Sequence, residues 1–459
     1  MAILKSPYHE AGIRDSPMQR IATADSTGYT DIIMTIELIP FASPLHPGFD
    51  LEVAHRELFS AMSAEHDIRL TEPEKLPAGG ADAATGAAPD LQVVFIASGG
   101  TENQFVAAWA RLPRPVYLLT DGKHNSLAAS LEISAWVRTR GERCEILHGE
   151  PAEVSRRLGD LAAVEGTMRR LAGSRLGFIG TPSDWLIASS VDTESLRARF
   201  GTETERVDLE ELYRCIDGID PAAARQVAAE VRARSTEVVE PNEEALEQAA
   251  VIYLGLKQLI SDRGLTAITL RCFDLVGRYH NTGCLALALL NDEGIMAGCE
   301  GDQQALFSVV VANALTGEIP FLANPAAIDT AGNAVEIAHC MVATRVVRSF
   351  RLRSHFETGI GVAIEGDYDS ADLTISRIGG ADLSRAWVSE GRPEQAEYSE
   401  ERCRTQLRLQ LDGDVRYFLE EAVANHHVAV RGRWTDRFAA FFARAGISAD
   451  CGGRRCGAA

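Results

Sequence analysis

The chain has 459 residues, a formal net charge of −20 and 46% hydrophobic residues. A chain of this size can bury more than one core, with about two to four domains of ~100–200 residues each, so it is globular and not disordered. Its acidity repels phosphate backbones, and no apolar run reaches the roughly 18 residues of a membrane span, so we expect neither nucleic acid nor a membrane as partner.

The N-terminal segment and the cysteines bear on where the protein works. Residues 1–30 show no periodicity and no signal-peptide pattern, so we expect a disordered or extended segment in a cytoplasmic protein. The nine cysteines form no CxxC pair, and most lie in apolar runs, so we expect neither disulfides nor structural zinc. Residues 448–459 are predicted to be a disordered tail.

Apolar strands alternate with a helical pattern in the first predicted domain, residues 31–173. The strands are expected at 31–41, 91–100 and 115–122, and a helix with apolar residues at helical spacing follows at 125–141. This alternation predicts a parallel sheet. Lys123 and His124, in the turn before the helix, are interpreted as substrate-binding residues at the rim of the sheet.

A second α/β domain is predicted for residues 174–345, and a β domain with a closing helix for residues 346–447. Long helical patterns separate the strands of the second domain, whereas the third shows alternating strands without helices between them. We therefore predict an α/β fold with two Rossmann-like parallel-sheet domains, followed by an antiparallel β-barrel-like C-terminal domain.

Two carboxylates, Glu300 and Asp302, lie between an apolar strand and an apolar helix in the stretch IMAGCEGDQQALFSVV. Open parallel sheets bind ligands at the carboxyl ends of their strands, so Glu300 stands where a site is expected. Asp302 can instead cap the first turn of the helix, where its charge suits the helix dipole. Both are candidate catalytic residues, with capping as the alternative for Asp302.

Histidines in strand-like runs are the next candidates, because an unpaired buried imidazole is costly. Such a histidine is either a satisfied core residue or a ligand, and imidazoles near a strand-end carboxylate suit a divalent metal. No short spacing motif decides between these alternatives. The histidines are His339, His355, His426 and His427.

Arg353 and Arg404 also lie in apolar strand-like contexts, where a buried guanidinium needs an anionic partner. They either form structural ion pairs or clamp a carboxylate of the site or a polar substrate. We include both as candidate substrate-binding residues, together with Glu357 and His339.

Five segments resemble the L-fucose isomerase / L-arabinose isomerase superfamily. The resemblance spans roughly residues 267–432 and is weaker in the two N-terminal domains. It implies two α/β domains followed by a β-barrel-like domain, a homo-oligomer (trimer or hexamer) that completes the sites, and a Mn²⁺-type ion that assists aldose–ketose isomerisation. The segments are GIMAGCEGDQQALFSVVVANALTGEIPFLANP, IAHC, RSHFETGIGV, CRTQ and NHHVAVRG.

The resemblance also implies roles for individual residues. Glu300 matches the family's first metal-binding glutamate, which can also transfer the proton. His355, in the pattern HxxxGIG, looks like the ligand of arabinose isomerases. The pair His426 and His427 matches the C-terminal ligand histidine, without a choice between the two.

One position departs from the family pattern. Fucose isomerases have an aspartate ligand 24 residues after the glutamate, and Asn324 stands there in this chain (324 − 300 = 24). Its amide oxygen can still coordinate a metal, but the amide cannot act as a base. The second glutamate of arabinose isomerases is not evident either, and His339 in that region can take over as ligand.

These observations predict a metal-dependent intramolecular oxidoreductase that interconverts an aldose and a ketose. A metal chelates the carbonyl and a neighbouring hydroxyl oxygen, and Glu300 moves the proton between C1 and C2, with Asp302 or Glu357 as orienting neighbour. Two alternatives stay open. One is an isomerase acting on an acidic or phosphorylated sugar, and the other is a non-catalytic carbohydrate-binding relative.

Overall fold

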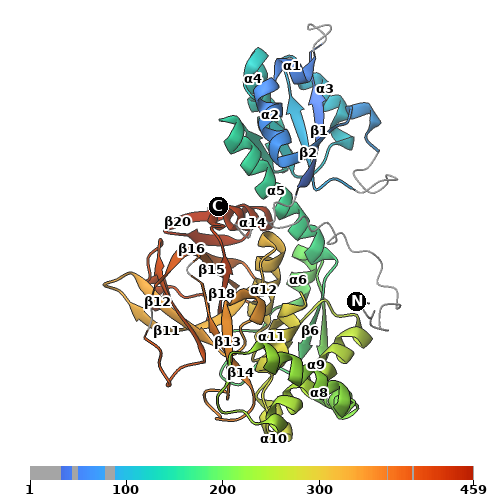
Figure 1. The fold of residues 1–459 in the computed structure, drawn as a ribbon. Helices are drawn as coiled ribbons and strands as arrows, with labels where there is room; N and C mark the ends of the chain where they lie inside the picture. The colour runs from blue at the N-terminus through green and yellow to red at the C-terminus, as the bar shows by residue number, and fades with distance from the viewer. Residues whose placement is uncertain (1–32, 44–49, 78–87, 370, 395–396, 458–459) are drawn as a thin grey trace, which may run out of the picture. The chain divides into compact units, whose positions relative to one another are not determined.

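The computed structural model describes residues 33–43, 50–77, 88–369, 371–394 and 397–457 (Figure 1). The chain divides into two compact units, Met1–Ala162 and Ala163–Ala459. The predicted N-terminal segment 1–30 lies outside the described residues. Every helix in the described ranges is too short or too polar to cross a lipid bilayer.

The first unit is built on a parallel sheet in the order β2-β1-β3-β4-β5, as the sequence predicted. Both faces of the sheet are buried, because successive residues of β3 contribute to two separate hydrophobic clusters. Helices pack against each face. The strands are β1 (Met34–Phe41), β2 (His66–Leu70), β3 (Leu91–Ile96), β4 (Val116–Leu119) and β5 (Cys144–Leu147), and the main helices are α2 (Arg56–Glu65), α3 (Glu102–Ala108), α4 (Ser126–Arg138) and α5 (Pro151–Ala172).

A second parallel sheet, in the order β10-β9-β6-β7, opens the second unit. The predicted parallel arrangement is therefore confirmed. The strands are β6 (Arg175–Ile179), β7 (Glu203–Val207), β9 (Ala267–Leu270) and β10 (Met296–Gly298), and the helices include α6 (Thr193–Phe200), α7 (Leu209–Asp217), α8 (Pro221–Arg234), α9 (Glu243–Arg263), α11 (Cys284–Asp292) and α12 (Gln303–Thr316).

A closed antiparallel barrel of six strands follows, in the order β15-β18-β11-β12-β17-β16, and pairing of β15 with β16 closes it. The predicted barrel-like domain is confirmed, and it includes β11 and β12, which lie before the predicted boundary at residue 346. Strands β14, β13 and β8 form a separate small sheet, and β14 packs against barrel strand β17. The barrel strands are β11 (Phe321–Asp329), β12 (Ala334–His339), β15 (Leu373–Gly379), β16 (Arg385–Glu394), β17 (Thr405–Leu411) and β18 (His427–Arg431), and the small sheet holds β8 (Glu237–Val238), β13 (Ser349–Arg353) and β14 (Ala363–Asp367).

The C-terminal segment corrects two sequence predictions. It forms a hairpin of β19 (Ser448–Cys451) and β20 (Arg454–Gly457), and β19 pairs with the edge of β16. Gly452 and Gly453, both at positive φ, make the turn. A disulfide joins Cys451 to Cys456. The predicted disordered tail is therefore wrong for the described part, because backbone pairing with β16 orders a segment that has few apolar side chains of its own.

Helix α12 lies between the parallel sheet of the second unit and the barrel (Figure 1). It contacts β9 and β10 on one side and β15 and β18 on the other. The helix is buried nearly all round, and one continuous hydrophobic core joins sheet, helix and barrel. This packing brings the carboxyl ends of β9 and β10 against the ends of barrel strands.

Candidate functional site

Glu300 is held in a strained turn directly after β10. Glu300 has φ 60° and Gly301 has φ 72°, so two successive residues adopt the left-handed conformation. A side chain at Gly301 would place its Cβ only 2.5 Å from the carbonyl oxygen of Thr181, so glycine is required. Trp185 Nε1 donates to Glu300 Oε2 at 2.7 Å. Non-glycine residues held in this region are concentrated at functional sites.

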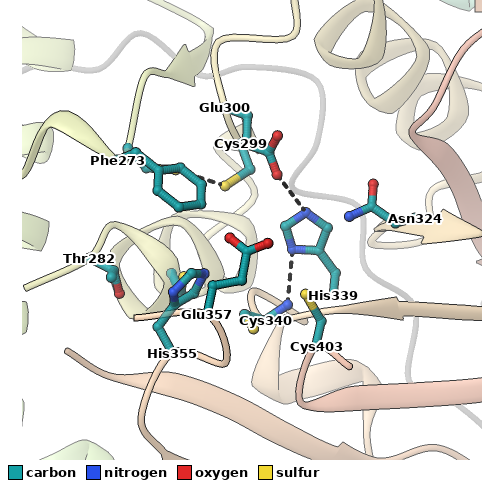
Figure 2. A pocket seen from close by; sticks show the side chains of 12 residues that line it. Phe273, Thr282, Cys299, Glu300, Asn324, His339, Cys340, His355, Glu357 and Cys403 are labelled. Carbon is teal, nitrogen blue, oxygen red and sulfur yellow. Dashed lines mark hydrogen bonds and ion pairs between the residues drawn. The ribbon is translucent and has the colours of Figure 1, made fainter. Parts of the chain in front are cut away.

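One pocket of the second unit brings five of the predicted site residues together (Figure 2). They come from loops after β10 and β13 and from barrel strands β11 and β12, which are far apart in sequence. These residues are Glu300, Asn324, His339, His355 and Glu357.

Several buried donor atoms converge on the Glu300 carboxylate. His426 Nε2 lies 3.5 Å from Glu300 Oε1, and His339 Nε2 lies 3.9 Å from the same oxygen. Within the described residues these two nitrogens, and Asn324 Oδ1, have no hydrogen-bond partner. Unpaired buried polar atoms are costly, and a carboxylate with two imidazoles and an amide oxygen is a donor set that suits a divalent cation. The residues therefore fit a bound metal ion.

Asp302 lies behind His426 and does not line the pocket. Its Oδ2 faces His426 Nδ1 at 3.0 Å, and its Oδ1 accepts from the Ala305 backbone N–H at 2.7 Å at the start of α12. Arg377 Nη2 lies 3.2 Å from Asp302 Oδ1, and both side chains are fully buried. Asp302 thus caps α12 and orients His426, as a carboxylate behind a metal-binding histidine does.

The charges of this chain of groups reinforce one another. Burial alone would raise the pKa of both carboxyls. The positive charge of His426 lowers the pKa of Glu300 to about 2, and Arg377 with His426 holds the pKa of Asp302 far below its usual range. Burial would lower the pKa of His426, but Asp302 and Glu300 raise it to about 9. A cation that binds at Nε2 of His426 must therefore displace a proton.

The tautomers of His339 and His426 differ. The Cys340 backbone N–H donates to His339 Nδ1 at 2.9 Å, and burial lowers the pKa of His339 to about 3. The single proton of the neutral His339 ring therefore lies on Nε2, facing Glu300. His426 Nδ1 instead faces a carboxylate, which leaves Nε2 as the coordinating nitrogen once its proton is lost. His426 is the better prepared ligand of the two.

The structure also separates His426 from its neighbour His427. His427 Nε2 pairs with the Tyr417 hydroxyl at 3.0 Å, and its Nδ1 faces the Asn425 carbonyl at 2.9 Å. His426 directly precedes β18 (His427–Arg431), and of the two rings it is the one whose nitrogen lies near Glu300. His427 lies in an aromatic cluster with Trp387. This placement favours the core alternative for His427.

His355 lines the pocket without reaching the converging atoms around Glu300. Its Nδ1 lies 3.1 Å from Thr358 Oγ1, and its ring packs edge-on against Phe273. Burial lowers the pKa of His355 to about 4, so the ring is neutral at pH 7. These contacts place His355 in the pocket wall.

Arg353 and Arg404 are engaged by carboxylates of the protein. Arg353 donates to Glu240, Glu365 and Glu400 at 2.6–2.9 Å, and Arg404 Nη1 donates to Glu400 at 2.7 Å. Neither arginine lines the pocket. The contacts match the structural alternative for both residues.

Lys123 and His124 belong to the first unit, in the turn before α4. Lys123 Nζ lies 3.5 Å from Asp121, and His124 has φ 53°. They are not among the residues that line the Glu300 pocket. Their substrate-binding role stays a prediction.

Sequence reasoning missed several residues of the pocket. Trp185 contacts Glu300 from a loop after β6, and the only signal for it was its place after a strand end. Most of the cysteines were interpreted as core residues because they lie in apolar runs. Those that line the pocket are Cys272, Cys284, Cys299, Cys340 and Cys403.

Comparison with known proteins identifies distant relatives. No protein-family model matches the chain. A sulfoquinovose isomerase from Alkalicoccus urumqiensis is 24% identical over 265 residues, which is 56% of this chain and 59% of that protein. A second sulfoquinovose isomerase, from Clostridium sp. (strain MSTE9), is 24% identical over 268 residues with the same coverage.

The third relative is an L-arabinose isomerase from Nocardioides sp. (strain ATCC BAA-499 / JS614), 29% identical over 184 residues, which is 38% of this chain and 36% of that protein. The match thus spans less than two thirds of each relative. The resemblance predicted from sequence segments is confirmed: the chain is a distant relative of the sugar isomerases of the fucose/arabinose isomerase-like group.

Proposed function

We propose that the protein is a metal-dependent aldose–ketose isomerase that acts at the Glu300 pocket. The observation that carries the proposal is the convergence of His426 Nε2 and His339 Nε2 on Glu300 Oε1, both without hydrogen-bond partners among the described residues, in a site whose pocket Asn324 also lines. The distant relationship to sulfoquinovose and arabinose isomerases supports the same reaction class. From the family resemblance of the sequence segments we propose Mn²⁺ as the ion and a homo-oligomer, a trimer or hexamer, as the assembly.

In this mechanism Glu300, His426, His339 and Asn324 would hold the ion, with the His339 proton moved from Nε2 to Nδ1 so that Nε2 can coordinate. When bound, the ion would polarise the carbonyl and the adjacent hydroxyl of an open-chain sugar, which makes the neighbouring C–H more acidic. Asp302 keeps the His426 ring oriented, with Nδ1 donating to Asp302 and Nε2 facing the site. The ionised Glu300 provides the negative charge that a divalent ion requires.

Two carboxylates of the pocket are available for proton transfer. A pKa of about 2 makes Glu300 a weak base, although its position next to the converging donors suits a ligand. Burial and the charge of Glu300 raise the pKa of Glu357, so this carboxyl accepts a proton more readily. We therefore assign metal binding to Glu300 and the movement of the carbon-bound proton to Glu357, with Glu300 as the alternative base.

The charge of the pocket lining favours a neutral sugar as substrate. Its lining, as far as the structure describes it, contains acids, histidines and cysteines but no lysine or arginine. An anionic group on the sugar would meet the negative charge of Glu300 there. A second candidate is an acidic sugar, which the relationship to two sulfoquinovose isomerases favours.

An isomerase screen tests the proposal. Neutral and anionic aldoses, including arabinose and sulfoquinovose, are incubated with protein supplemented with Mn²⁺, and ketose formation is measured. We expect Glu300→Gln to abolish both turnover and the stabilisation by Mn²⁺, and Glu357→Gln to abolish turnover alone. Glu318→Gln, the same substitution at a half-buried glutamate outside the pocket, serves as the matched control.

Near wild-type turnover in Glu300→Gln would refute the assignment. If no aldose is converted and Mn²⁺ does not raise the thermal stability, the non-catalytic carbohydrate-binding alternative is favoured instead.

A further inference from the structure

Five of the seven free cysteines in the described chain line the Glu300 pocket. The proposed isomerisation uses none of them. Thiols at this density beside a carboxylate and imidazoles form a second donor set, of a different chemical character from the oxygens and nitrogens discussed above. The cysteines are Cys272, Cys284, Cys299, Cys340 and Cys403.

Two of these sulfurs are already close together. Cys272 follows β9 and Cys299 follows β10, and because the two strands are parallel neighbours their carboxyl ends bring the thiols to the same edge. The Sγ atoms are 3.2 Å apart and buried. Cys299, Glu300 and His339 each offer a donor atom within 4.8 Å of the other two.

His339 provides an independent sign of a ligand. Its side chain is buried, and Nε2 faces Glu300 without a hydrogen-bond partner among the described residues. In Figure 2 the His339 ring lies between the Glu300 carboxylate and Cys340, with Cys299 beside Glu300.

We propose that the pocket binds a thiophilic divalent cation, of the Zn²⁺ or Cd²⁺ class, through Cys272, Cys299, Glu300 and His339. Two sulfurs, one carboxylate oxygen and one imidazole nitrogen complete a four-coordinate set of the kind that Zn²⁺ takes in proteins. Manganese prefers oxygen-rich sites and gains little from the sulfurs.

We call the set of Cys272, Cys299, Glu300 and His339 the soft site. It shares Glu300 and His339 with the proposed Mn²⁺ site, which also uses His426 and Asn324. The two kinds of ion therefore exclude one another. Binding of the soft ion would release the thiol protons of Cys272 and Cys299 to solvent, so the two sulfurs become thiolates and balance the charge of the ion. The proton of His339 would move from Nε2 to Nδ1, which breaks the contact of Nδ1 with the Cys340 N–H and frees Nε2 to coordinate. A thiophilic ion in this set would therefore prevent Mn²⁺ from binding at the pocket.

Cobalt provides a direct probe. Full-length protein, stripped of metal with a chelator and kept reduced, is titrated with Co²⁺ under anaerobic conditions. We expect a sulfur-to-cobalt charge-transfer band in the near ultraviolet that saturates at one ion per chain and disappears when Zn²⁺ is added. Mn²⁺ should produce no such band.

Variants assign the band to residues. Cys299→Ser and Cys272→Ser should each weaken Co²⁺ binding by at least about tenfold, because loss of even an outer partner of a metal site costs 10–100-fold. Cys215→Ser, at a free cysteine outside the pocket, should leave the band unchanged. Absence of the band in the wild type, or its persistence in the Cys272→Ser/Cys299→Ser double variant, overturns the proposal.

If the cysteine variants do not fold, a measurement on the wild-type protein still tests the proposal. Mn²⁺ is bound first and monitored by electron paramagnetic resonance, and one equivalent of Zn²⁺ should release it. Retention of Mn²⁺ beside bound Zn²⁺ would overturn the shared site. Neither assay uses turnover, so a protein that shows the thiolate band but converts no sugar would support the soft site and contradict the isomerase proposal.

Discussion

Replacing Asp302 can separate its role as the N-cap of α12 from its contacts with Arg377 and His426. Asp302→Asn keeps the volume of the side chain and an oxygen that can accept from the Ala305 N–H, but it removes the negative charge. Asn caps helices about as well as Asp, so the start of α12 should be preserved. The effect of the substitution therefore reports on Arg377 and His426.

The magnitude follows from the burial of Arg377. Its guanidinium is fully buried, and among the described residues Asp302 is the carboxylate that contacts it, at 3.2 and 3.3 Å. Its Nε and Nη1 have no partner in that part of the chain. Removing one member of a buried ion pair leaves an uncompensated charge and costs about 3–5 kcal/mol. We expect Asp302→Asn to lower the free energy of unfolding by that amount.

Urea unfolding of the chelator-treated protein, followed by circular dichroism, measures this cost. The matched control is Asp220→Asn, at the N-cap of α8, where Asp220 accepts from the Ala222 N–H but contacts no buried cation that the structure describes. The control should change the free energy of unfolding by less than about 0.5 kcal/mol. In calorimetric titration Asp302→Asn should also bind Mn²⁺ about 10–100-fold more weakly, because His426 loses its orienting carboxylate.

Two outcomes would refute this reasoning. If Asp302→Asn unfolds at the same urea concentration as the wild type, Arg377 is not balanced by Asp302. If the stability falls but the affinity for Mn²⁺ does not, His426 is not a ligand oriented by Asp302.

Three further predictions concern the pocket. His426→Gln should weaken Mn²⁺ binding by at least about 10-fold, whereas His427→Gln should destabilise the barrel and leave the affinity unchanged, as calorimetric titration and urea unfolding can show. Asn324→Asp should tighten Mn²⁺ binding, because a charged oxygen replaces a neutral one; unchanged affinity would place residue 324 outside the site. Burial lowers the pKa values of His339 and His355 to about 3 and 4 in the folded state. Between about pH 4 and 6.5 these histidines therefore bind protons only in the unfolded chain, which stabilises the unfolded state as the pH falls. The urea midpoint of the metal-free protein should thus decrease as the pH is lowered from about 6.5 to about 4.

The order of elements was predictable because each strand and helix has its own pattern. The run 91–100 is mostly apolar and becomes β3, the alternating run 372–380 becomes β15, and the helix pattern at 125–141 becomes α4. The start of the barrel was harder to place, because β11 and β12 follow α12 directly and do not differ in composition from strands of a parallel sheet. Their antiparallel partners, β17 and β18, lie far along the chain.

The site was predictable only in part, because its geometry depends on side-chain direction. Glu300 was evident from its position after a strand, but His426 and His427 are adjacent and only the register of β18 with β11 shows which one faces the pocket. Arg353 and Arg404 could be recognised as buried cations, yet their partners Glu240 and Glu400 lie at other places in the sequence. The sequence could not identify the pocket cysteines, because a buried cysteine has apolar neighbours in the sequence whether it packs in the core or lines a site.

Arg377, Asp302, His426 and Glu300 form a chain of buried groups in which positive and negative charges alternate when His426 is protonated. Each member stabilises the charge of the next, which explains why Glu300 is a strong acid and His426 a strong base in the same site. A divalent ion at Nε2 would take the place of the His426 proton and keep the alternation, so the arrangement suits a cation at that position. The neutral amide of Asn324 then leaves the site with less negative charge than an aspartate would, and Glu357 and the pocket thiols are nearby groups that could supply it.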